Sequence, residues 1–150
     1  LFVMFSDESG ENEAFTGSAK IDKDGFIFIT GRIKNMIVLS GGKKVFPEEV
    51  ESVIEKSPFI SEVCVLGMSR TFGVKDGTEE ITAVAVPAND VIGKYDNDTI
   101  EKLVKNEIKK LSQRLTPYKR PVNIIVRTEP LPRTTTRKVK RKEVKQLINA

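Results

Sequence analysis

Two short apolar runs constrain the fold of this chain more than any other feature of its sequence. The runs EVCVLGM (62–68) and ITAVAVP (81–87) are apolar at both odd and even positions. A strand of this kind is buried on both faces, so it belongs at the centre of a sheet that is covered on each side. The sequence therefore predicts two central strands between other layers of structure.

Three helices are expected around these strands. They are predicted from Pro47 to about residue 56, over 97–115, and over 140–149, and each has apolar residues spaced three or four positions apart. The residues expected to face inward are Val50, Val53, Ile54, Ile100, Leu103, Val104, Ile108, Leu111, Leu115, Val144, Leu147 and Ile148.

Further strands are expected at 36–40 and 122–127, and Asp24-Gly25 predicts the turn of a hairpin over 21–32. The acidic segment 6–19 has no periodicity and is predicted to be a loop. The predicted fold class is α+β: a small mixed sheet of about three or four strands flanked by helices and preceded by a β-hairpin.

Composition excludes several kinds of chemistry. The chain has one cysteine, Cys64, and no histidine. An internal disulfide, the usual zinc ligands and every histidine-based nucleophile are therefore excluded, and no metal site is predicted. The apolar runs are strand-sized and none approaches the ~20 residues of a membrane span. Any chemistry must use lysine, arginine, carboxylates or the backbone.

Positive charge is concentrated near the end of the chain. From Tyr118 onward there are ten Lys/Arg against two Glu, although the whole chain has a net charge of only +4. Such asymmetry usually indicates an anionic partner. A basic surface that binds RNA or DNA, a solvated run of charges, and a device that delivers one ammonium group to a phosphate all remain open at this point.

Three stretches place cations or glycines where a buried core needs none: 31–51, LTPYKRP (115–121) and LPRTTTRKVKR (131–141). Gly41-Gly42 before Lys43-Lys44 is not a Walker A loop, because Ile37 stands where that motif needs a glycine and Lys44 where it needs Ser or Thr. The glycines form either a tight turn or a passage for a thin ligand. RTTTRK is rich in β-forming residues and is expected to hold an extended backbone that projects Lys138.

Together these stretches resemble the C-terminal domain of the acyl-adenylate-forming enzymes, the family of acyl-CoA synthetases, adenylation domains and luciferases. The segment DGFIFITGRIKNMIVLSGGKKVFPEEVE (24–51) resembles the family's hinge-and-loop motif, and LPRTTTRKVKR resembles its terminal Leu-Pro-x-Thr-x-x-Gly-Lys-x-x-Arg motif. In detail the chain looks most like bacterial long-chain fatty-acid–CoA ligases.

The resemblance implies a reaction in two steps. A carboxylate, here a long-chain fatty acid, reacts with ATP to give an acyl-adenylate and pyrophosphate, and the thiol of CoA then displaces AMP. The chain's own large N-terminal domain would bind most of the ATP and its Mg²⁺. By this resemblance residues 1–33 are a remnant of that domain with its terminal hairpin, and 34–150 form a lid domain that rotates between the steps.

The resemblance also implies roles for individual residues. Lys138 corresponds to the adenylation lysine, Lys34 to the hinge and Arg32 to the arginine near the ATP ribose. Arg141 would support the site. The loop that lines the CoA passage would contain Ser40, Gly41, Gly42, Lys43 and Lys44.

Two positions depart from the family pattern. Thr16-Gly17-Ser18 stands where the family has Thr-Gly-Asp, so the ribose-binding aspartate is missing, and Arg137 replaces the glycine before the lysine. We interpret the chain as a fragment of a longer cytoplasmic ligase, inactive alone, with at most peripheral membrane contact. The alternative is a small basic nucleic-acid-binding module.

Overall fold

The central sheet of the protein is mixed and has three strands, as predicted. The computed structural model describes residues 2–6, 12–69 and 79–149, with the backbone alone for 2–6, 12–20 and 28–33. Strand β7 (Glu79–Pro87) lies in the middle, antiparallel to β6 (Ile60–Ser69) and parallel to β8 (Asn123–Val126). Most of the segment between β6 and β7, residues 70–78, lies outside the described residues.

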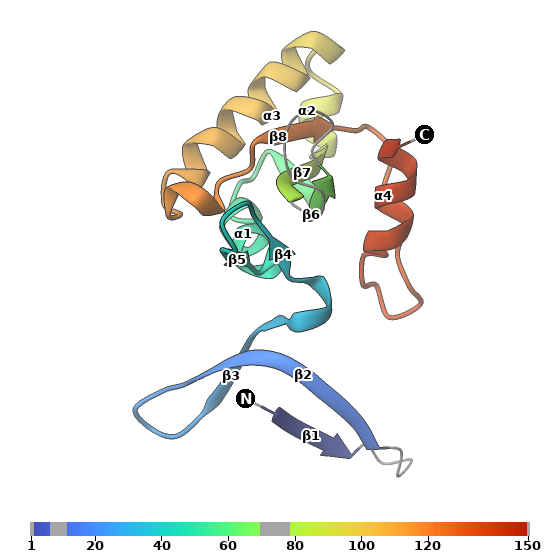
Figure 1. The fold of residues 1–150 in the computed structure, drawn as a ribbon. Helices are drawn as coiled ribbons and strands as arrows, with labels where there is room; N and C mark the ends of the chain where they lie inside the picture. The colour runs from blue at the N-terminus through green and yellow to red at the C-terminus, as the bar shows by residue number, and fades with distance from the viewer. Residues whose placement is uncertain (1, 7–11, 70–78, 150) are drawn as a thin grey trace.

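Helices cover both faces of this sheet (Figure 1). The helices α1 (Pro47–Ile54) and α3 (Asn97–Ser112) pack on one face, and the short α2 (Asn89–Ile92) joins β7 to α3. The other face is covered by α4 (Arg141–Asn149) and by Leu131. Strand residues alternate between the two cores: Val63, Val65, Ile81, Ala83 and Ala85 face α1 and α3, while Cys64, Leu66, Val84 and Val86 face α4.

The inward residues of the helices are largely as predicted, except for Leu147 and for Leu111, which is only partly buried and belongs to neither core cluster. Val50, Ile54, Ile100, Val104, Ile108, Leu115 and Val144 are buried, and Val53, Leu103 and Ile148 pack partly against the cores. Leu147 was expected to face inward but is 45% exposed. In the nine-residue α4, Val144 and Ile148 lie four positions apart and together occupy the contact with the sheet, which leaves Leu147 on the flank.

A second sheet at the N-terminal end contains β1 (Phe2–Ser6), β2 (Asn12–Ile21) and β3 (Ile27–Arg32). The Asp24-Gly25 turn between β2 and β3 is confirmed, with Gly25 at φ +86°. The prediction of a loop over 6–19 was wrong for Ser6, which ends β1, and for residues 12–19, which belong to β2. This polar strand pairs with β1 on one edge and β3 on the other, so ladder hydrogen bonds stabilise it without an apolar pattern.

A short connecting region links the N-terminal sheet to the rest of the molecule. It contains the 3₁₀ turn η1 (Ile33–Asn35) and a small hairpin of β4 (Ile37–Val38) and β5 (Lys44–Val45). The strand predicted at 36–40 is thus only two residues long. Among the described residues, no helix is long and apolar enough to cross a membrane.

Candidate functional site

Lys138 lies at the end of a tight turn that connects Leu131 to α4. Arg133 and Val139 form an isolated antiparallel bridge, and the Thr134 N–H donates to the Lys138 carbonyl oxygen at 2.8 Å. The expectation of an extended backbone over RTTTRK was therefore wrong. Arg137 adopts φ +64°, a left-handed conformation that side chains oppose and glycine tolerates. This geometry explains why a glycine suits the position before the lysine.

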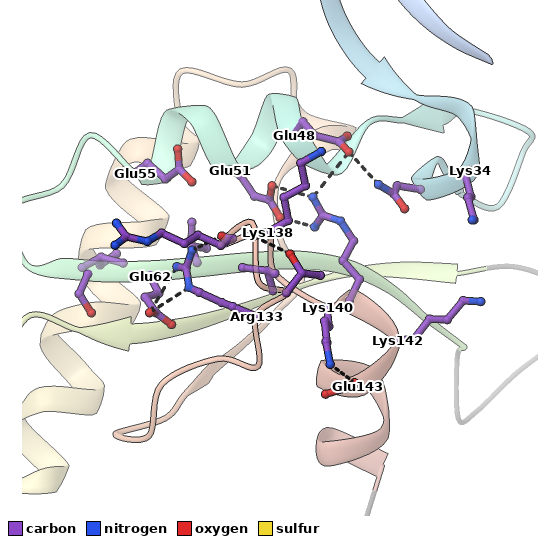
Figure 2. Close-up of a pocket in the computed structure, with 18 residues that line it drawn as sticks. Lys34, Glu48, Glu51, Glu55, Glu62, Arg133, Lys138, Lys140, Lys142 and Glu143 are labelled. Atoms are coloured by element: carbon purple, nitrogen blue, oxygen red, sulfur yellow. Dashed lines mark hydrogen bonds and ion pairs between the residues drawn. The ribbon is translucent and has the colours of Figure 1, made fainter. Parts of the chain in front are cut away.

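The Lys138 side chain is exposed and lines an open groove of about 950 Å³. Figure 2 shows the groove with side chains from α1, β6, the 133–139 turn and α4 around it. The ammonium of Lys138 forms no ion pair or hydrogen bond with any residue that the structure describes. The charge is thus available to an anionic ligand.

Lys34, the predicted hinge residue, is exposed in η1 and lines the same groove. Its neighbour Asn35 is tied to α1, because Asn35 Nδ2 donates to Glu48 Oε1 at 3.0 Å. The sequence placed Lys34 and Lys138 about a hundred residues apart, and the fold brings both to one groove. Arg32 ends β3, and its side chain lies outside those described.

Arg141 lines the same groove and forms a partly buried ion pair there. Its guanidinium donates to both oxygens of Glu51 and to the Val65 carbonyl oxygen at 2.8 Å, and Glu51 also accepts the Val65 N–H at 2.8 Å. Burial opposes the charge on Arg141, but the hydrogen bond to Glu51 and the charge of Glu51 outweigh it and raise the pKa of the guanidinium. Arg141 therefore holds α4 against α1 and β6.

Two further groups near Arg141 have shifted pKa values. Burial raises the pKa of the Cys64 thiol to about 12, although Arg141 opposes the shift. A thiol of this kind stays protonated near neutral pH and is no nucleophile. Partial burial also raises the pKa of the Glu55 carboxyl, and the Glu51 carboxylate adds to the shift.

The Gly41-Gly42 loop forms a tight turn with an open outer surface. Both glycines have positive φ, +88° and +81°, and a Cβ built on either would meet no atom within 4 Å. The turn is closed by the Leu39 N–H, which donates to the Lys43 carbonyl oxygen at 2.8 Å. Both interpretations made from the sequence, a tight turn and room for a thin ligand, fit this geometry.

Cations and one aromatic ring surround the glycine loop. Ser40 and Lys44 are exposed, and Lys43 Nζ lies 4.6 Å from the centre of the Tyr118 ring. Tyr118 and Lys119 belong to η2 (Pro117–Lys119), and Lys119 Nζ pairs with Glu49 at 2.8 Å. The sequence marked 115–121 as unusual but gave it no role. Its contact with the glycine loop depends on tertiary packing that sequence spacing does not show.

Helix α1 separates the groove from the glycine loop. Glu48, Glu51 and Glu55 line the groove, and their spacing of three and four residues puts them on one side of the helix. Glu49 is rotated by about 100° from Glu48 and pairs with Lys119 beside the glycine loop. The groove that contains Lys138 and the glycine loop predicted to bind CoA thus lie on different sides of one helix.

No group of three or more Asp, Glu, Cys or His side chains among the described residues could hold a metal ion.

Comparison with known proteins identifies the family. Residues 49–138 match the model described as "AMP-binding enzyme C-terminal domain", and this match covers more than half of the chain. The chain belongs to the family of AMP-binding enzyme C-terminal domains, found in adenylate-forming acyl-CoA ligases.

Several relatives are CoA ligases with different named substrates. The chain is 33% identical to an indoleacetate–CoA ligase from Aromatoleum aromaticum over 128 residues, which are 85% of this chain and 22% of the relative. It is also 33% identical to the long-chain-fatty-acid–CoA ligase FadD13 from Mycobacterium tuberculosis over 131 residues, 87% of this chain and 23% of the relative. The chain thus spans about a fifth of the length of these curated relatives.

Solved structures support the fold. A Mycobacterium tuberculosis fatty acyl CoA synthetase superimposes with a TM-score of 0.64 at 27% identity, over 95% of this chain and 25% of that one. The adenylation domain of a carboxylate reductase from Mycobacterium chelonae gives a TM-score of 0.74 at 21% identity, over 95% and 22%. The α+β fold is confirmed, and the comparisons do not support the nucleic-acid-binding alternative.

Proposed function

We propose that residues 34–150 are the lid domain of an ATP-dependent acyl-CoA synthetase, and that residues 1–33 belong to the large domain that precedes it. The observation that carries the proposal is the exposed ammonium of Lys138, which has no partner among the described residues and sits on a constrained turn. A cation held in this way can meet a phosphate on a larger partner without first breaking an ion pair.

In the first step, Lys138 binds the attacking carboxylate and the α-phosphate of ATP, where negative charge accumulates. A preorganised cation stabilises this charge more than water does, because it need not reorient during the reaction. Arg32 contacts the ATP ribose, and Arg141 supports the turn from below. The large domain holds the Mg²⁺ that accompanies ATP.

In the second step, the lid rotates at Lys34 and presents the glycine loop instead. The position of Lys34 in a short turn between two sheets supports a hinge, because a hinge needs only a few residues that absorb a change in φ and ψ. Gly41 and Gly42 leave room for the thin pantetheine arm of CoA. Ser40, Lys43 and Lys44 flank that passage, and the lysines attract the CoA phosphates.

The proposed substrate is a long-chain fatty acid, and the proposed location is cytoplasmic with at most peripheral membrane contact. The names of FadD13 and of the M. tuberculosis fatty acyl CoA synthetase support this substrate. Indoleacetate–CoA ligase is equally similar in sequence, so an aryl acid is the competing choice.

Full-length protein given ATP, CoA and a series of carboxylates tests the proposal. We expect AMP, pyrophosphate and an acyl-CoA thioester, with the highest kcat/KM for long-chain fatty acids. The chain of residues 1–150 alone should give none of these products, because one cation cannot orient two substrates. Release of ADP instead of AMP would contradict the class of reaction, and a preference for indoleacetate would contradict the substrate alone.

A bulky residue at Gly42 should block the second step only. In the full-length enzyme, Gly42→Leu should lower thioester formation from supplied acyl-adenylate by about tenfold or more, because the side chain enters the passage. Pyrophosphate exchange should stay within about twofold of wild type. Both half-reactions are measured separately.

Gly25→Leu is the matched control for this variant. Gly25 has a similar φ of +86° and equally open surroundings, but it lies in the β2–β3 turn. Equal losses in the two variants would show that backbone strain, and not a blocked passage, causes the effect.

A further inference from the structure

The peptide bond between Arg137 and Lys138 is held from both sides. The Arg137 carbonyl oxygen accepts a hydrogen bond from Arg133 Nη1 at 2.8 Å, and the Lys138 N–H donates to Thr134 Oγ1 at 3.1 Å. Because a peptide unit is planar, two such contacts fix its orientation and the position of the Lys138 Cα. Two side chains earlier in the turn thus set the direction in which Lys138 leaves the backbone.

Arg133 is itself fixed to the central sheet by Glu62. Glu62 Oε1 lies 3.3 Å from both Nε and Nη2 of Arg133. The other oxygen, Oε2, accepts the N–H of the buried Leu131 at 2.8 Å. Glu62 is on β6 and its side chain is only 19% exposed. A continuous series of contacts therefore connects β6 to the peptide unit between Arg137 and Lys138.

This anchoring matters because the turn contains Arg137, a residue other than glycine with a positive φ. A residue other than glycine resists φ +64°, so the turn would relax toward other conformations if nothing held it. The Arg133 contact is made with the carbonyl of the strained residue itself. It therefore opposes the relaxation that would move Lys138.

We infer that Glu62 and Arg133 are positioning residues for Lys138, with Thr134 as the second contact on the same peptide. The inference rests on the proposed role of Lys138 in adenylation. A lysine has a long flexible stem, so the stem must start from a fixed point if its ammonium is to meet the α-phosphate reproducibly. A displacement of about 1 Å at a reacting centre is enough to cost a large factor in rate.

Arg133→Met in the full-length enzyme tests this inference. We expect kcat for pyrophosphate exchange to fall about tenfold, because Lys138 is misplaced but present. KM for ATP and thioester formation from supplied acyl-adenylate should both stay within about twofold. Arg127→Met is the matched control, since Arg127 pairs with the exposed Glu129 outside the turn. It should leave both half-reactions unchanged.

Combination with Lys138→Ala separates this inference from the proposed function. If Arg133 acts through Lys138, Arg133→Met should cause no further loss once Lys138 is gone. A normal exchange rate in Lys138→Ala would overturn the proposed function. A large effect of Lys138→Ala with an Arg133→Met rate near wild type, or a further loss in the double variant, would overturn the positioning role alone.

Thr134 provides a second test if Arg133→Met does not fold. Thr134→Ser keeps the hydroxyl that accepts the Lys138 N–H, whereas Thr134→Val keeps the shape and loses the acceptor. We expect the exchange rate to fall about tenfold in the valine variant and to stay near wild type in the serine variant. Equal rates in the two variants would overturn the inference.

Discussion

Lys138→Ala in the full-length enzyme is expected to lower the rate of pyrophosphate exchange by about 10²–10³-fold. By the proposed mechanism, this ammonium stabilises charge that accumulates on the α-phosphate, and the alanine variant lacks it. Thioester formation from supplied acyl-adenylate should change by less than about threefold, because in the proposed second step the rotated lid presents the glycine loop and not this turn. The two half-reactions are measured separately by isotope exchange and by CoA consumption.

Lys109→Ala is the control for loss of one positive charge. Lys109 is exposed on α3, across the sheet from α4, so it should have no effect on either half-reaction. An equal loss of both half-reactions in Lys138→Ala would refute a role confined to adenylation. Such a result would point to a disturbed lid instead.

Arg141→Ala is expected to lower the free energy of unfolding by about 3–5 kcal/mol. The substitution leaves the Glu51 carboxylate, only 12% exposed, without its charged partner, and it also removes the donor to the Val65 carbonyl oxygen. Urea denaturation of wild type and variant gives the difference. The loss is one of packing and charge, so it should occur with or without substrates.

Two further variants serve as controls for the Arg141→Ala measurement. Lys140→Ala removes an exposed ion pair with Glu143 in the same region and should cost at most about 1 kcal/mol. Glu51→Gln combined with Arg141→Met removes both charges and should recover part of the stability lost in Arg141→Ala. If Arg141→Ala were no more destabilising than Lys140→Ala, the ion pair would not be the contact that holds α4 in place.

Local patterns were sufficient to predict most of the fold. The runs at 62–68 and 81–87 lie in β6 and β7. They were predictable because a strand that is covered on both faces can have apolar residues at every position. The spacing of Ile100, Val104 and Ile108 likewise placed α3. The polar strand β2 was missed because its sequence has no clear alternation of apolar residues, whereas its pairing with β1 and β3 depends on segments outside it.

The candidate site could be predicted only in part. Lys138, Lys34 and the glycines stood out through motifs, but their roles stay predictions until they are tested. The contact of Glu51 with Arg141 joins residues far apart in the sequence, and so does that of Glu62 with Arg133. No local pattern reports such pairs. The turn before Lys138 was misjudged because threonines favour strands, whereas the hydrogen bonds of Thr134 favour a turn here.

The two flanks of α1 are each fastened to a different part of the chain, Glu49 to Lys119 and Glu51 to Arg141. An eight-residue helix held in this way cannot twist about its own axis, so both flanks travel together whenever the domain turns. In the proposed enzyme, the lid therefore cannot support adenylation of a new acid at the same time as transfer of the previous acyl group to CoA.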